Sequence, residues 1–150
     1  MRQLWLGSVS IFVLAAAGPV LAQTTPRTLT LGQSVQSSMG PEDPVLESDD
    51  SSYEMFQVQA PKGQLVTVTL TSTAFQPIVA IGEEISEECE ECSTSIGETD
   101  KAAIARKIVP ASGVLQVRVN AMNKGDRGAF TLVATATTPP RISARPLPFG

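Results

Sequence analysis

The sequence predicts an all-β protein, an antiparallel β-sandwich of about seven to eight short strands. Short alternating runs rich in Val, Ile and Thr recur along the chain, and a period of two places successive side chains on opposite faces of a strand. Sequences rich in Gly, Pro, Ser and Asn separate these runs, as expected for turns between antiparallel strands. Outside residues 1–22 and one glutamate-rich run, no stretch shows the hydrophobic period of an amphipathic helix.

The clearest strand lies in residues 64–71, where Val66, Val68 and Leu70 share one face. Such a strand has a core face and a solvent face. Similar patterns occur on both sides of it, joined by turns such as 61–63 and 110–113. In chain order, we expect strands over residues 27–35, 52–59, 64–71, 77–81, 102–109, 114–120 and 129–135.

The two ends of the chain lie outside this pattern. Residues 1–22 combine the basic Arg2, an apolar run and small residues ending at Ala22, which predicts a secretory signal peptide and a mature chain beginning at Gln23. Residues 137–150 contain four prolines, which predict a flexible or polyproline-like tail. We therefore expect one domain over 23–136 in a periplasmic or secreted protein, with no membrane span in the mature chain.

The charge distribution and composition exclude several classes of function. All acidic residues except Asp126 lie between residues 42 and 100, where Lys62 is the only base. A chain with a formal net charge of −4 is a poor match for nucleic acid, so we expect no nucleic-acid partner. The chain has no histidine, which removes the common catalytic triads and the most frequent general base. We expect a protein that is not an enzyme.

The only two cysteines, Cys89 and Cys92, lie in a long connection between two predicted strands. In an exported protein, the simplest expectation is a local disulfide. The flanking glutamates disfavour a thiolate and therefore redox catalysis. Zinc would need two further ligands from glutamates or another chain. A thiol-disulfide or metal-handling role for calcium or zinc stays as the alternative.

The same connection forms a candidate contact or cation loop over residues 83–100. Its carboxylates have no compensating base in the sequence before Lys101, so either a cation or a basic partner would relieve their repulsion. The spacing lacks the short Asp/Asn pattern that calcium favours. We expect no resident cofactor, at most weak calcium binding, and a protein partner with a basic surface. The acidic residues are Glu83, Glu84, Glu87, Glu88, Glu90, Glu91, Glu98 and Asp100.

Four segments of the chain form an ordered set: LTLGQSVQSSM at 29–39, SSYEMFQVQAPKGQLVTVTLTSTAFQPIVAIG at 51–82, KIVPASGVLQVRVNA at 107–121 and GDRGAFTLVA at 125–134. In this order they resemble the bacterial pre-peptidase C-terminal domain family. The resemblance implies a small jelly-roll-like β-sandwich of a kind usually appended to secreted peptidases. Together with the acidic loop, it favours an exported, non-catalytic module that acts by protein binding or structural support.

Overall fold

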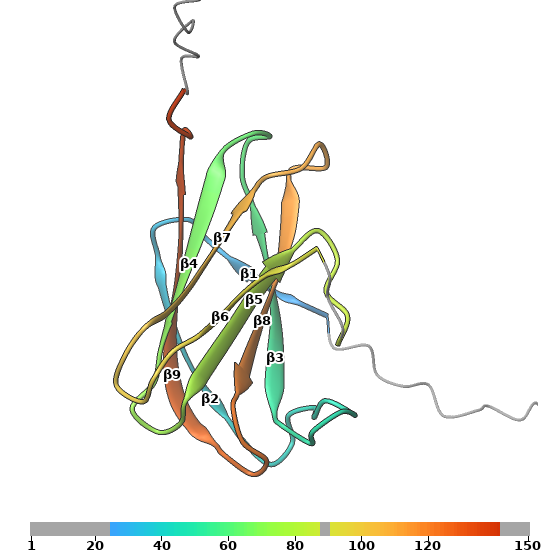
Figure 1. Cartoon of the computed structure of the whole chain (residues 1–150), viewed down its shortest axis with the longest axis vertical. Helices are drawn as coiled ribbons and strands as arrows, with labels where there is room; N and C mark the ends of the chain where they lie inside the picture. The colour runs from blue at the N-terminus through green and yellow to red at the C-terminus, as the bar shows by residue number, and fades with distance from the viewer. Residues whose placement is uncertain (1–24, 88–90, 142–150) are drawn as a thin grey trace, which may run out of the picture.

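The computed structural model describes residues 25–87 and 91–141. Within these ranges the chain forms nine strands and no helix, which confirms the predicted all-β class (Figure 1). No described segment could therefore cross a membrane as a helix. The strands are β1 (Arg27–Leu29), β2 (Ser34–Met39), β3 (Tyr53–Gln59), β4 (Leu65–Thr71), β5 (Pro77–Gly82), β6 (Ser93–Ile96), β7 (Ala103–Ile108), β8 (Val114–Ala121) and β9 (Gly128–Thr137).

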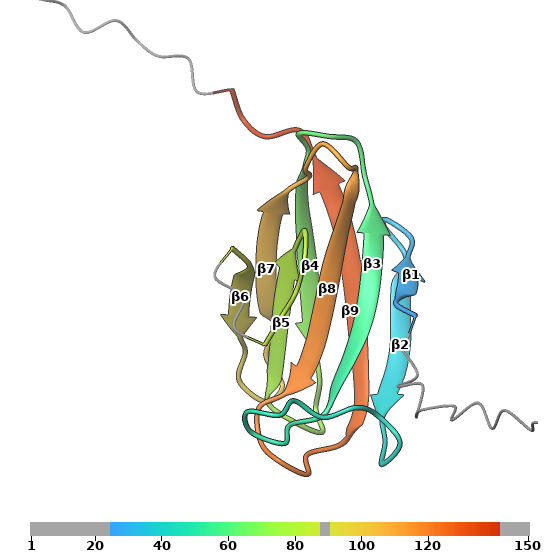
Figure 2. The same cartoon turned by 90° about the vertical axis from the view of Figure 1, so that its right-hand side faces the viewer.

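The strands form two sheets packed face to face. One has the order β1-β3-β8-β5-β6 and the other the order β2-β9-β4-β7. All neighbouring strands are antiparallel except β1 and β3, which run parallel. Figure 2 shows β6 and β7 together at one side of the sandwich and β1 and β2 together at the other.

The pairing is nested around the segment between β5 and β6. β5 pairs with β6, β4 with β7, β3 with β8 and β2 with β9. The chain from β2 to β9 is thus one long hairpin rolled into two sheets, which is the jelly-roll arrangement the resemblance implied. Residues 83–92, the acidic connection between β5 and β6 that contains the cysteines, are the tip of this hairpin.

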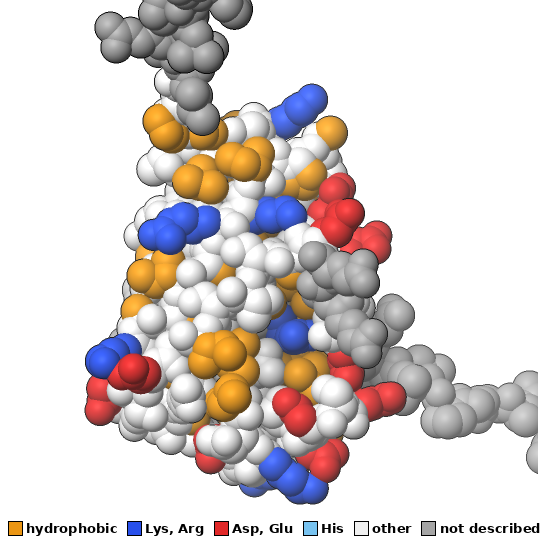
Figure 3. Space-filling model, in the orientation of Figure 1, with side chains coloured by type: hydrophobic (Ala, Val, Ile, Leu, Met, Phe, Trp, Pro, Cys, Tyr) orange, Lys and Arg blue, Asp and Glu red, His pale blue; other side chains and the backbone are white. Residues whose placement is uncertain are grey.

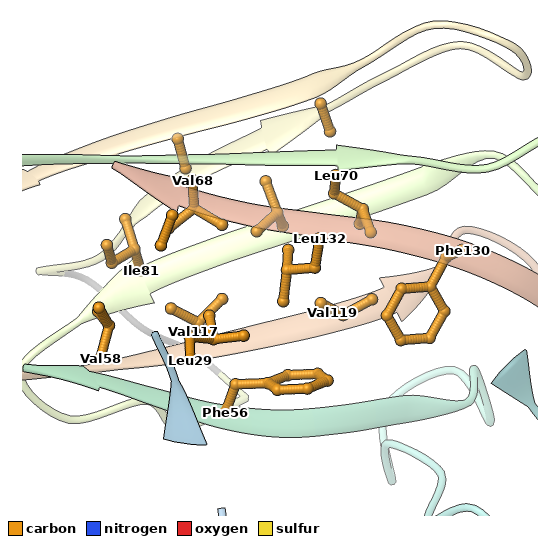
Figure 4. Close-up of a cluster of buried hydrophobic side chains, with 14 of the residues drawn as sticks. Leu29, Phe56, Val58, Val68, Leu70, Ile81, Val117, Val119, Phe130 and Leu132 are labelled. Atoms are coloured by element: carbon orange, nitrogen blue, oxygen red, sulfur yellow. The ribbon is translucent and has the colours of Figure 1, made fainter. Parts of the chain in front are cut away.

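The core lies between the inner faces of the two sheets. The alternating residues Val66, Val68 and Leu70 of β4 are fully buried, as their spacing predicted. Phe130 of β9 meets Phe56 edge-on at a centroid distance of 6.3 Å, and Figure 4 shows both rings within the cluster of aliphatic side chains. Burying each large apolar side chain contributes about 1.5–3 kcal/mol.

The expected single strand over 27–35 is in fact two strands in different sheets. Gly32 has a φ of 77°, a left-handed conformation that glycine adopts without the steric cost of a Cβ atom. The chain turns there, with the amide of Gln33 donating to the carbonyl of Thr30 at 3.1 Å. β1 consequently joins the five-stranded sheet, and β2 joins the other.

Two further boundaries differ from the sequence-based expectation. The connection after β5 contains the four-residue strand β6, whose sequence Ser-Thr-Ser-Ile carries too little apolar alternation to predict a strand. Thr137, assigned to the tail by its sequence, is the last residue of β9 because it pairs with Leu65 of β4. Of the remaining tail, residues 138–141 follow β9 without regular secondary structure, whereas residues 142–150, like the predicted signal peptide 1–22, lie outside the described residues.

The edges of the two sheets meet where β6 lies beside β7. The Ser95 hydroxyl accepts from the amide of Ile104 at 3.1 Å, and the Ser93 hydroxyl accepts from the amide of Arg106 at 3.4 Å. These serines therefore supply acceptors to an edge of β7 that would otherwise be open to pairing with another chain. Their contacts also hold the hairpin tip against the side of the sandwich.

Candidate functional site

A groove of about 490 Å³ lies where the hairpin tip meets β7 and the turn after it. The tip supplies three glutamates, β7 supplies a lysine and an isoleucine, and the turn and β8 complete the floor. The lining residues are Glu83, Glu84, Glu91, Lys107, Ile108, Pro110 and Leu115. This groove brings together charged and apolar groups that are far apart in the sequence.

The groove combines negative charge with an accessible apolar surface. The side chains of Glu83, Glu84 and Glu91 are exposed, and the Lys107 ammonium group donates to the backbone carbonyl of Glu91. The groove lining thus contains three carboxylates and one ammonium group, an excess of negative charge. Ile108 is 47% exposed beside them. In Figure 3, acidic side chains gather along one flank next to hydrophobic and basic ones.

Glu87 belongs to a different environment, although it is only a few residues away in the sequence. Its carboxylate accepts from the backbone amides of Glu47 and Ser48, with the Ser48 nitrogen 3.1 Å from Oε2. It also lines a separate hollow with Arg118, on the outer face of β8. Glu87 therefore attaches the hairpin tip to the loop between β2 and β3 and does not line the groove.

Arg118 fixes the other part of the tip. Its guanidinium donates to the Ser86 carbonyl at 2.9 Å and to Oδ1 of Asn120 at 3.1 Å. Arg118 is only 8% exposed. Burial lowers the pKa of its guanidinium, and the nearby carboxylate of Glu87 acts in the opposite direction. The buried, hydrogen-bonded guanidinium of Arg118 thus attaches the tip to β8.

The structure divides the predicted acidic loop into separate sites. Glu98 and Asp100 follow β6, whose four residues span about 13 Å, so they lie away from the groove glutamates. Glu98 pairs with Lys101, and the amide of Asp100 donates to the carbonyl of Ser72 at 3.1 Å. Glu88 and Glu90 lie outside the described residues.

Cys92 packs where β5 ends and β6 begins. Its sulfur lies 3.4 Å from the carbonyl oxygen of Glu84. Cys89 lies outside the described residues, so its pairing with Cys92 stays a prediction. Among residues 25–87 and 91–141, no group of three or more His, Cys, Asp or Glu side chains is arranged to hold a metal ion.

The groove glutamates could be predicted from the sequence, but the residues opposite them could not. Lys107 and Ile108 reach the tip only because β7 pairs with β4 and contacts β6 across the edge of the sandwich. One signal was present in the sequence: on β7 the outward positions carry Ile104 and Ile108, where a solvent face would ordinarily be polar.

No family model and no curated protein sequence matches the chain. The pre-peptidase C-terminal domain of a collagenase from Bacillus anthracis has a similar structure, with a TM-score of 0.53 at 10% identity over 74% of this chain and 95% of that one. PliG from Aeromonas hydrophila, a periplasmic inhibitor of g-type lysozyme, gives a TM-score of 0.48 at 15% identity over 75% of this chain and 100% of that one.

The collagenase domain confirms the predicted resemblance at the level of fold. The chain has a β-sandwich like that of the pre-peptidase C-terminal domain. The likeness concerns the fold alone and carries no function over to this chain.

Proposed function

We propose that the chain is an exported, non-catalytic β-sandwich module that binds a protein partner with a basic surface through the groove beside β7. The observation that carries this proposal is the placement of Glu83, Glu84 and Glu91 around an exposed Ile108. Protein interfaces typically combine an apolar centre with a polar rim. The excess of carboxylates favours a partner rich in Lys and Arg and increases its rate of association.

The groove is less well suited to a calcium ion. Calcium takes six to eight oxygen ligands, often from several carboxylates and carbonyls around one point. Here the Lys107 ammonium group reaches into the acidic segment and donates to the Glu91 carbonyl, where it would repel a cation. We therefore propose at most weak calcium binding, with calorimetric titration as the measurement and micromolar affinity as the contradicting result.

Export and the cysteine pair belong to the same proposal. We expect cleavage after Ala22 and a disulfide between Cys89 and Cys92 that shapes the hairpin tip. A ring this short restricts the unfolded chain little, so the bond should contribute at most about 2 kcal/mol. Intact mass and alkylation without reductant, on protein from its native compartment, test both points. Two freely labelled thiols would support the metal or thiol role in place of the disulfide.

Partner capture tests the proposed binding directly. The purified chain is immobilised and exposed to the native envelope or supernatant fraction at low and at high salt. We expect a bound protein at low salt that is released at high salt, because screening weakens exposed charge interactions. The variant Glu83→Gln/Glu84→Gln/Glu91→Gln should lose most of this capture. Capture that is indifferent to salt and to these substitutions would overturn the proposal.

A further inference from the structure

The C-terminal end of the sandwich lies close to the groove. Thr137, the last residue of β9, pairs with Leu65 of β4, and Leu65 pairs with Ile108 of β7. Two strand spacings, about 10 Å, therefore separate Thr137 from Ile108. Figures 1 and 2 show the end of β9 and the turn between β7 and β8 at the same end of the molecule.

The chain that follows β9 is long enough to enter the groove. Eight residue steps separate Thr137 from Arg145, and extended or polyproline chain advances about 3.1 Å per residue, so Arg145 can lie roughly 25 Å from Thr137. This reach exceeds the separation from Ile108 more than twofold.

The chemistry of this segment complements the groove. Residues 138–150 read TPPRISARPLPFG, with Arg141 and Arg145 as the charged side chains and no acidic residue. Leu147 and Phe149 provide apolar side chains close to the second arginine. The groove offers the opposite set, three carboxylates beside the exposed Ile108.

We infer that residues 141–149 dock in the groove of their own chain and compete there with the basic protein partner. The arginines lie against the groove carboxylates, and the apolar side chains cover Ile108. This inference rests on the proposed function, because it assigns a second occupant to the same groove. Its consequence is regulation: a partner binds only to the extent that it displaces the segment.

The energetics favour such a contact even when it is intrinsically weak. A segment tethered a few residues away has an effective concentration in the millimolar range. An intrinsic dissociation constant near 1 mM therefore suffices to fill a substantial fraction of the grooves. Residues 138–150 contain four prolines, and because the proline ring fixes φ, a segment of this composition has less backbone entropy to lose on docking.

The test is the affinity of a labelled peptide of residues 138–150 for the full chain and for its variant Arg141→Glu/Arg145→Glu. We expect the peptide to bind this variant roughly two- to tenfold more tightly at low salt, because its groove is no longer occupied in cis. The conservative variant Arg141→Lys/Arg145→Lys should behave like the unaltered chain. Amide chemical shifts of Lys107 and Ile108 should differ between the unaltered chain and the glutamate variant.

The outcomes separate this inference from the proposed function. Equal peptide affinity for the unaltered chain and the glutamate variant would overturn the docking in cis, as would unchanged amide shifts at Lys107 and Ile108. Absence of peptide binding to either chain would also overturn it, whereas the proposed function is decided independently by partner capture. A concentration-dependent dimer that disappears in the glutamate variant would place the segment in another copy and contradict the intramolecular form.

Discussion

The sulfur of Cys92 occupies the space beside the α-carbon of Gly82. A Cβ atom added to Gly82 would lie 2.7 Å from that sulfur and 3.1 Å from the carbonyl oxygen of Glu84. The last residue of β5 is therefore a glycine because the returning chain packs directly on its backbone. This contact sets how closely the two arms of the hairpin approach where the groove glutamates leave the sandwich.

Gly82→Ala should consequently destabilise the protein by about 1–3 kcal/mol, the usual cost of inserting a methyl group into a filled space. Cys92 or the carbonyl of Glu84 must move to accept it. Chemical denaturation measures the free energy of unfolding. Gly40→Ala is the control, because a Cβ there would only meet Asp43 at 4.0 Å. A Gly82→Ala protein as stable as the control would contradict the tight packing.

Arg118→Leu should lower the free energy of unfolding by about 1–3 kcal/mol, since it removes the donor to the Ser86 carbonyl and to Asn120. Amide hydrogen exchange at residues 83–87 should accelerate as the tip loses this attachment. Arg118→Lys keeps the charge without the planar fork, so its effect should be intermediate. Unchanged exchange in the leucine variant would show that the tip is held by other contacts.

Ser93→Ala/Ser95→Ala should cost about 0.5–1.5 kcal/mol for each hydrogen bond to the β7 amides. The larger expected effect is on solubility, because the edge of β7 becomes available for pairing with another chain. Light scattering at increasing protein concentration measures this. Ser112→Ala, in the turn after β7, is the matched control. Equal scattering from both variants would argue against edge protection by the two serines.

Glu54 should make stability depend on pH. Its side chain is 12% exposed, and burial raises the pKa of its carboxyl from 4.5 despite the hydrogen bond from Ser37 and the pairing with Arg27. A raised carboxyl pKa contributes stability at pH below 4.5 that is lost as the pH rises through the folded-state value. Glu54→Gln should therefore flatten this decline, measured by thermal unfolding across pH. The exposed Glu42→Gln control should not; identical pH profiles for the two variants would contradict the prediction.

The strands of the core could be predicted because their side chains alternate in a way that only burial on one face explains. The inward-facing Val66, Val68 and Leu70 show this most clearly. The break at Gly32 was not predicted, because an alternating run continues across it and only the φ of 77° reveals the turn. β6 was missed because serines serve its edge contacts, and hydroxyl side chains carry no apolar period.

Only the acidic residues of the candidate site could be predicted from the sequence. Sequence proximity joined Glu84, Glu87 and Glu98 into one acidic loop, whereas the structure places them in three environments. Strand β6 separates Glu98 from Glu84, and the carboxylate of Glu87 accepts hydrogen bonds from backbone amides. Lys107 and Ile108 belong to β7, which lies beside the tip because of the nested strand pairing. That pairing joins residues far apart in the chain, so local sequence patterns do not predict it.

The most direct test of the account is the affinity of the captured partner for two variants that remove equal charge from different places. Glu83→Gln/Glu84→Gln/Glu91→Gln alters the groove, and Glu42→Gln/Glu98→Gln/Asp100→Asn alters exposed carboxylates elsewhere. Calorimetry at low salt should show binding weakened about tenfold or more by the groove variant, a loss of at least about 1.4 kcal/mol, and by less than about twofold in the control. Equal weakening by both variants would mean that net charge, and not the groove, governs binding, and would contradict the account.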